Sequence, residues 1–152
     1  MIDFRSSALS HVLRNNKKYI FKKNQKIHHI EQLTSSFGFN CSNLFIPTSD
    51  DEKNKANDDL DISFKHIVIF PGGNWPPKLW SADNFNKIMK LLLTKYHNIK
   101  FILVGSLKEK NKFYNQLIKG ISEDLIIDLF GYNLTLTSAY MKKSKIFIGN
   151  DS

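Results

Sequence analysis

Apolar and polar positions in the second half of the chain alternate between short β-like runs and helical stripes. Four apolar, β-rich runs are the expected strands, at residues 66–70, 99–104, 125–129 and 145–149. Between them apolar residues recur at helical spacing, which predicts helices over residues 81–96, 108–119 and 135–143. This order with short connections predicts an α/β domain, a Rossmann-like parallel sheet with right-handed crossovers, over residues 65–152.

The region before this domain divides into two unlike parts. Residues 47–64 are predicted to be an acidic, polar, exposed linker, because residues 47–61 have almost no apolar positions. Residues 1–46 contain only short strand-like and helical pieces, at residues 2–4, from 6 onward, at 19–21 and at 29–37. Because two short strands cannot bury a sheet of their own, we interpret residues 1–46 as the remnant of an incomplete domain.

Composition narrows the class of protein. The chain has 152 residues, of which 41% are hydrophobic and 12% aromatic, values typical of a globular protein. Its longest apolar runs are of strand length, which predicts no membrane-spanning segment, and its start lacks the apolar core of a signal peptide. The single cysteine, Cys41, excludes an intramolecular disulfide and fits a reducing compartment. We therefore expect a cytoplasmic protein.

The formal net charge of +8 favours an anionic partner without identifying it. Much of the charge is concentrated in residues 14–26. Nucleic acid, anionic lipid and a small phosphorylated substrate all remain compatible with this segment, as does a solvated lysine-rich face. Zinc spacing, an RNP-like aromatic motif and a convincing helix-turn-helix are all lacking in the sequence, so we do not expect nucleic acid. His28 and His29 have no carboxylate or cysteine beside them, so a metal site is not expected either.

The loop after the first strand, PGGNWPPKLW at residues 71–80, carries the strongest chemical signal. Ligands of an open parallel sheet bind at the carboxyl ends of its strands, where this loop must lie. Gly72 and Gly73 allow close backbone approach and free N–H groups, and Lys78 adds a positive charge suited to a diphosphate. The alternative is a simple turn with a solvated lysine. The loop has neither the Walker A spacing nor a GxGxxG fingerprint.

Two acidic residues follow other strands. Glu109 lies at the start of a helix, where an acid either complements the helix dipole or binds a ribose or base. Asp151 follows the last strand directly. It is either a turn residue or a functional acid at the carboxyl end of that strand. We expect Lys78, Glu109 and Asp151 to lie on one edge of the sheet.

Taken together, these loops resemble glycosyltransferase family 9, the ADP-heptose:lipopolysaccharide heptosyltransferases. The segment FPGGNWPPKLWSADNF is similar to the family's small-residue loop and Lys-x-Trp segment, with Lys78 and Trp80 in place. Gly105 with Glu109 four residues later, and Gly131 after the third strand, follow in the same order. The chain ends at Gly149–Ser152, where the family has G-x-D-[ST]-G-x-x-H. Residues 2–10 (IDFRSSALS) and 28–33 (HHIEQL) are similar to the end of the family's amino-terminal domain.

The resemblance implies a B-type glycosyltransferase of two Rossmann-like domains, of which this chain contains most of the donor-binding domain and part of the preceding one. It implies metal-independent, inverting transfer of a heptosyl unit from ADP-heptose to an anionic lipopolysaccharide inner core, with peripheral contact at the inner membrane. Lys78 would stabilise the leaving diphosphate, and Glu109 would hold the nucleoside. The remaining residues implied in donor binding are Gly72, Gly73, Asn74, Gly131, Asp151 and Ser152.

The same resemblance leaves two parts of the family pattern without a counterpart. The family's general base, an acid early in the first domain, is absent from this sequence, as are the Gly and His after Ser152. We therefore expect the chain to be inactive by itself. Two alternatives stay open: another sugar-nucleotide transferase or epimerase of this architecture, and a non-catalytic nucleotide- or polyanion-binding module.

Overall fold

The computed structural model describes Ile2–Asp3, Tyr19–Ile20, Glu31, Ser35 and residues 46–151. The chain forms two compact units, Met1–Phe45 and Ile46–Ser152. In the first unit, strands β1 (Ile2–Asp3) and β2 (Tyr19–Ile20) pair in parallel, in line with two of the expected strand pieces. Cys41 lies outside the described residues, as do the helices expected there apart from Glu31 and Ser35, and the basic segment 14–26 apart from β2.

Four parallel strands form the sheet of the second unit, in the order β5-β4-β3-β6. They are β3 (Lys65–Phe70), β4 (Ile99–Gly105), β5 (Ile126–Phe130) and β6 (Ile146–Gly149). The helices between them are α4 (Ala82–Lys95), α5 (Leu107–Ile118) and α6 (Leu134–Lys143), with 3₁₀ turns η1 (Pro76–Lys78) and η2 (Glu123–Leu125). The parallel sheet is confirmed, and Ile67 pairs with Phe101 in parallel register.

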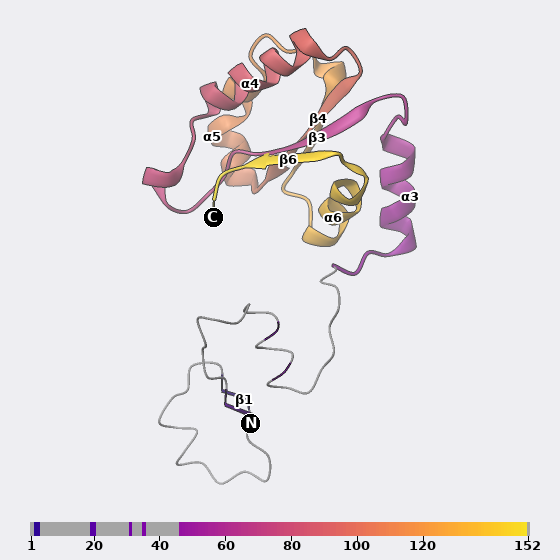
Figure 1. Cartoon of the computed structure of the whole chain (residues 1–152), viewed down its shortest axis with the longest axis vertical. Helices are drawn as coiled ribbons and strands as arrows, with labels where there is room; N and C mark the ends of the chain where they lie inside the picture. Colours follow the sequence, from indigo (N-terminus) through magenta and orange to yellow (C-terminus); the bar gives the residue numbers. More distant parts are fainter. Residues whose placement is uncertain (1, 4–18, 21–30, 32–34, 36–45, 152) are drawn as a thin grey trace. The chain divides into compact units, whose positions relative to one another are not determined.

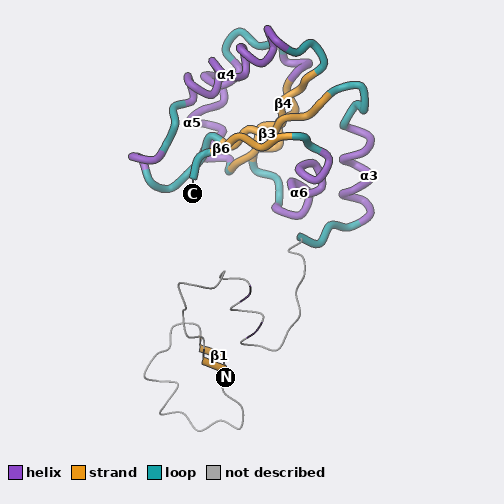
Figure 2. The backbone as a smooth tube through the Cα atoms, in the orientation of Figure 1, coloured by secondary structure: helices purple, strands orange, loops and turns teal. Residues whose placement is uncertain are grey.

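Helices cover both faces of this sheet (Figures 1 and 2), with α4 and α5 on one face and α3 and α6 on the other. Because side chains alternate along a strand, β3 and β4 divide between two cores. The core under α4 and α5 contains Ile67, Ile69, Phe85, Met89, Phe101, Leu103 and Leu117. The core under α3 and α6 contains Val68, Ile102, Val104, Leu136, Ala139 and Tyr140. Such burial on both faces explains why β3 and β4 are apolar throughout.

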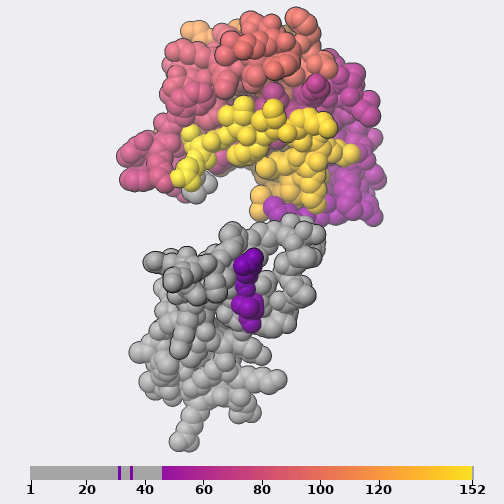
Figure 3. Space-filling view, viewed as in Figure 1, coloured from indigo at the N-terminus to yellow at the C-terminus, as the bar shows by residue number. Residues whose placement is uncertain are grey.

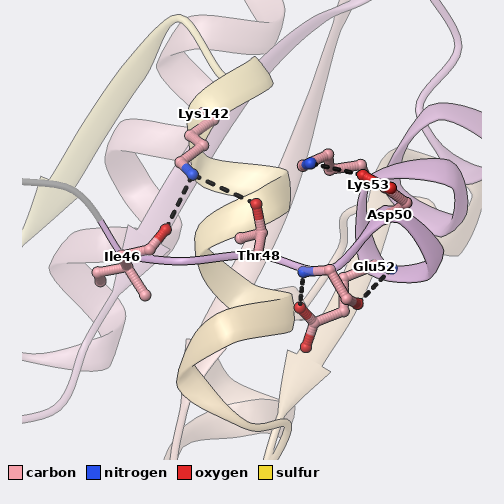
Figure 4. Close-up of polar contacts among 7 residues, drawn as sticks. Ile46, Thr48, Asp50, Glu52, Lys53 and Lys142 are labelled. Carbon is pink, nitrogen blue, oxygen red and sulfur yellow. Dashed lines mark hydrogen bonds and ion pairs between the residues drawn. The ribbon is translucent and has the colours of Figure 1, made fainter.

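The structure differs from the expected linker over 47–64, because α3 (Asp50–Asp59) occupies most of it and belongs to the second unit. Acidic residues fill its first turn, and Ser49 and Glu52 cap each other reciprocally (Figure 4). Lys142 of α6 donates hydrogen bonds to the Ile46 carbonyl and the Thr48 hydroxyl, at 3.0 and 3.4 Å.

Only two residues of this region enter the core, and that explains the discrepancy. Ala56 and Leu60 are buried against α6, while the remaining positions of α3 are polar and solvated. Two apolar positions give too weak a stripe to indicate a helix. A polar contact completes the docking of α3 against α6: the hydroxyl of the buried Tyr140 donates a hydrogen bond to the Asp59 carboxylate.

Candidate functional site

The carboxyl ends of β3, β4 and β6 bring the predicted site loops to one edge of the sheet. The loop after β3 and the end of β6 lie side by side near the C label in Figure 1, and the Asn150 backbone N–H donates to the Phe70 carbonyl at 3.1 Å. The Gly131 N–H donates to the Gly105 carbonyl at 2.8 Å, joining the ends of β5 and β4. The expected convergence of these loops on one edge is therefore present.

Asn150 holds the loop formed by residues 71–80. Its side-chain oxygen accepts from the Trp80 N–H at 2.8 Å, and its side-chain amide donates to the Pro71 carbonyl at 2.8 Å. Trp80 also packs edge-on against Phe85, with ring centroids 5.0 Å apart. This role of Asn150 was missed by the sequence interpretation, although its position between the glycine and the acid after a strand is a signal that could have been used.

Lys78 and Asp151 meet directly. The Lys78 ammonium lies 2.6 Å from the Asp151 carboxylate and 5.2 Å from the centre of the Trp75 ring. Both charged side chains are exposed, at 47% and 73% of their surface, so this ion pair is screened and weak. The ammonium is therefore available to a stronger anion. Asn74 is exposed in the same loop, and Ser152 lies outside the described residues.

Glu109 connects the loops that follow β3 and β4. One carboxylate oxygen accepts from the Gly73 N–H at 3.1 Å, and the other accepts from the Ser106 N–H and hydroxyl at 2.7 and 2.8 Å. The second set is the capping box of α5, in which the Ser106 hydroxyl caps the Glu109 N–H. The Gly73 N–H, which we expected to be free for an anion, is thus occupied by a carboxylate.

The Glu109 carboxylate packs closely against the loop, and this explains why residue 72 is a glycine. A Cβ built on Gly72 would lie 1.8 Å from the Glu109 carboxylate oxygen, so any larger residue would force this carboxylate to move. A Cβ on Gly73 would lie 2.7 Å from the Leu79 side chain and 3.7 Å from the Asp151 carbonyl oxygen, so this position is also crowded.

A cleft of about 790 Å³ opens beside Glu109, between the loops after β4 and β5 and the first turns of α6. Its walls are largely apolar, formed by Phe70, Leu107, Tyr132, Leu134, Met141 and Phe147. Of the predicted site residues, Glu109 and Gly131 line this cleft, and the other described ones follow β3 and β6 on the same edge. A positive φ of 80° at Gly131 makes the turn that exposes Tyr132. The apolar walls were not predicted as part of the site.

These walls are exposed to solvent in part. Tyr132 and Phe147 show 51% of their surface, and Leu134 shows 66%. The β6 strand, which carries Phe147, is visible in yellow on the surface of the second unit in Figure 3. An apolar concavity bordered by a few polar groups, at the carboxyl edge of a parallel sheet, is typical of a small-molecule site.

The fold is a Rossmann-like α/β domain whose loops gather at the carboxyl edge of its sheet, where ligands of such sheets generally bind. The sequence profile of glycosyltransferase family 9 (heptosyltransferase) matches residues 4–152. The chain belongs to this family. A search of curated protein sequences finds no significant match.

Solved structures share the fold. Escherichia coli ADP-heptose lipopolysaccharide heptosyltransferase II is 21% identical with a TM-score of 0.57, over 74% of this chain and 36% of that one. A family 9 glycosyltransferase from Veillonella parvula is 18% identical with a TM-score of 0.70, over 90% and 41%. E. coli heptosyltransferase WaaC, solved with ADP-2-deoxy-2-fluoro heptose, is 15% identical with a TM-score of 0.59, over 90% and 42%. The chain thus spans about two fifths of these proteins.

Proposed function

We propose that this chain is the donor-binding part of a glycosyltransferase that transfers a heptosyl unit from ADP-heptose to the lipopolysaccharide inner core. One observation carries the proposal: in a family 9 chain, a glycine loop with its lysine and two acids meets at one sheet edge, beside an apolar cleft. WaaC, a structural neighbour, was solved with ADP and with an ADP-sugar analogue.

In the proposed arrangement the nucleoside occupies the cleft and the diphosphate lies over the glycine loop. Tyr132 and Leu134 offer an apolar surface for the base, and Glu109 lies at the boundary between the cleft and the loop. Lys78 would exchange its weak ion pair with Asp151 for the diphosphate, whose negative charge grows as the sugar leaves. Asn74 would contact the same phosphates, as would Gly73 once its N–H exchanges the Glu109 carboxylate for a phosphate oxygen.

No metal or other cofactor is part of this proposal, because Lys78 supplies the positive charge that the leaving diphosphate requires. The general base and the acceptor site are assigned to the other domain of the family architecture. The acceptor in this proposal is an anionic lipopolysaccharide core, reached in the cytoplasm at the inner face of the inner membrane. Among the described residues, none of the helices has the length and apolar character needed to cross a membrane.

Calorimetric titration of the chain with ADP and with inorganic diphosphate tests the proposal. Lys78→Ala should weaken binding of both ligands by about 1.5–3 kcal/mol, the usual value of a hydrogen bond to a charged group. Glu109→Ala should weaken ADP binding and leave diphosphate binding largely intact. Lys87→Ala is the matched control, since Lys87 is an exposed lysine on α4.

Two outcomes would contradict the proposal. Equal ADP affinity in the wild type, Lys78→Ala and Glu109→Ala would place the nucleotide elsewhere or nowhere on this chain. A loss in Lys87→Ala as large as that in Lys78→Ala would favour the alternative, a module that attracts polyanions through its overall positive charge.

A further inference from the structure

A second pocket, of about 450 Å³, lies at the amino edge of the sheet, where β3 and β6 begin. It is formed by the segment that joins α3 to β3 and by the end of α6. Its polar lining consists of Asn57, His66, Lys142, Lys143 and Lys145, and none of its described lining residues is acidic. The donor site proposed above lies at the opposite, carboxyl end of the same strands.

His66 is the most informative residue of this pocket. It lies on β3, is only 4% exposed, and its Nε2 atom is buried without a hydrogen-bond partner. Burial and the positive charge of Lys100 lower the pKa of the imidazole, so it is neutral at physiological pH. Buried polar atoms almost always have a partner, so this unpaired nitrogen beside several lysines makes His66 exceptional.

Two of the three lysines are available to such a group. Lys143 and Lys145 are exposed and form no ion pair among the described residues. Lys142 is occupied by the Ile46 carbonyl and the Thr48 hydroxyl (Figure 4). Within the described part of the chain, the carboxylate that acts on His66 is that of Asp61, which accepts hydrogen bonds from the Ser63 N–H and hydroxyl.

We propose that this pocket binds a phosphate group, with Lys143 and Lys145 supplying the positive charge and the imidazole of His66 lying in its wall, where it senses the bound anion. Phosphate provides several acceptor oxygens and the negative charge that such a donor set selects. Leu60, Ile62 and Phe64 line the remaining wall, so the preferred ligand is a phosphate ester with an apolar group beside the phosphate. The site is separate from the donor site, because His66 and Gly72 lie at opposite ends of β3.

The imidazole of His66 allows a direct test by NMR on the full chain, which contains five histidines. The His66 ring signal is assigned from its loss in His66→Asn and is then followed during titrations with inorganic phosphate and with phenyl phosphate. Vesicles of phosphatidylcholine containing phosphatidic acid form a third arm, which distinguishes a lipid headgroup from a free ester. The variants are Lys143→Ala and Lys145→Ala, with Lys87→Ala and Lys78→Ala as controls.

We expect a saturable shift of the His66 signal with both soluble ligands, with tighter binding of phenyl phosphate. The His66 pKa should rise when the anion is bound, because the anion stabilises the imidazolium against Lys100. Lys143→Ala and Lys145→Ala should each weaken binding on the order of tenfold, as for other charged hydrogen bonds. Both lysine variants should fold like the wild type, since both side chains are exposed. Their test therefore does not depend on the His66→Asn variant used for the assignment.

Every other outcome of these titrations either supports or overturns the proposed phosphate site. A His66 shift with the vesicles alone, lost in Lys143→Ala, would support the pocket and identify the phosphate as a lipid headgroup. Absence of a saturable His66 shift in all three arms would overturn it, as would an equal loss of binding in Lys87→Ala. Persistence of the shift in Lys78→Ala separates this site from the donor site, so either proposal can fail without the other.

Discussion

Replacement of Gly72 by alanine provides the most direct test of how the site is constructed. The added Cβ would lie 1.8 Å from the Glu109 carboxylate oxygen, and contact becomes ordinary only at 3.4 Å. The carboxylate must therefore leave its position, which breaks at least two of its three hydrogen bonds to Gly73 and Ser106. Two such bonds contribute about 1 kcal/mol each. The Phe70 ring, 2.9 Å from the same Cβ, adds an overpacking cost of about 1 kcal/mol.

The expected loss of 2–3 kcal/mol in the free energy of unfolding corresponds to a fall in Tm of about 10 °C or more for a unit of this size. Both tryptophans of the chain, Trp75 and Trp80, lie in the loop that Gly72 begins, so urea unfolding followed by tryptophan fluorescence reports on this loop directly. ADP titration of the folded variant gives the second readout.

A double-mutant cycle tests whether the Glu109 carboxylate is the cause of the stability loss in Gly72→Ala. In a Glu109→Ala background the carboxylate is gone, so Gly72→Ala should cost only the Phe70 contact, and the coupling free energy should be 1–2 kcal/mol. Additive losses, with a coupling below about 0.5 kcal/mol, would refute the reasoning, because they would mean that Gly72 is not required by the Glu109 carboxylate.

Two further predictions concern the supports of the site. Tyr140→Phe should lower the free energy of unfolding by about 1 kcal/mol in urea, since it removes the hydrogen bond to Asp59. That hydrogen bond lowers the pKa of Asp59. Its contribution to the free energy of unfolding is therefore complete above the unfolded pKa of about 4 and is lost as the pH falls. A difference in unfolding free energy between wild type and Tyr140→Phe that stays unchanged at pH 2–3 would contradict this. Asn150→Ala should accelerate hydrogen exchange at the Trp80 N–H at least tenfold, as two hydrogen bonds of the loop are lost. Asn150→Asp keeps the acceptor for Trp80 and loses the donor to Pro71, so its effect should be intermediate, and equal exchange in all three proteins would contradict the role of Asn150.

The sheet could be predicted from the sequence because β3 and β4 are buried on both faces, which makes them short apolar runs with clear breakers. The helix Asp50–Asp59 could not, because its docking depends on one alanine and on hydrogen bonds to α6, and neither produces an apolar stripe. Convergence of the site loops followed from the parallel order alone.

The details of the site depend on side-chain partners that spacing does not reveal. For Glu109 the sequence suggested either helix-dipole complementarity or ligand binding. The structure gives a capping box together with a bond to Gly73, which is distant in sequence. The same holds for Asn150, whose two contacts cross about 70 residues of chain. Long-range contacts of this kind are set by packing, so a local pattern cannot predict them.

Substitution of Asp151 by asparagine distinguishes the two roles open to that residue in the proposed function. In this structure the Asp151 carboxylate holds the Lys78 ammonium at 2.6 Å, so a diphosphate that binds Lys78 must displace it. Because both side chains are largely exposed, the pair contributes no more than about 1 kcal/mol, and its removal can strengthen diphosphate binding at most about fivefold.

Opposite effects on two ligands are therefore expected in Asp151→Asn. Inorganic diphosphate should bind up to fivefold more tightly, because Lys78 is freed and a like charge is removed. Binding of an intact ADP-sugar should gain less or weaken if the carboxylate accepts a sugar hydroxyl. An equal gain for both ligands would limit Asp151 to a competitor for Lys78. Weaker diphosphate binding would instead mean that Asp151 positions Lys78 for the phosphates, so that the ion pair persists when the donor is bound.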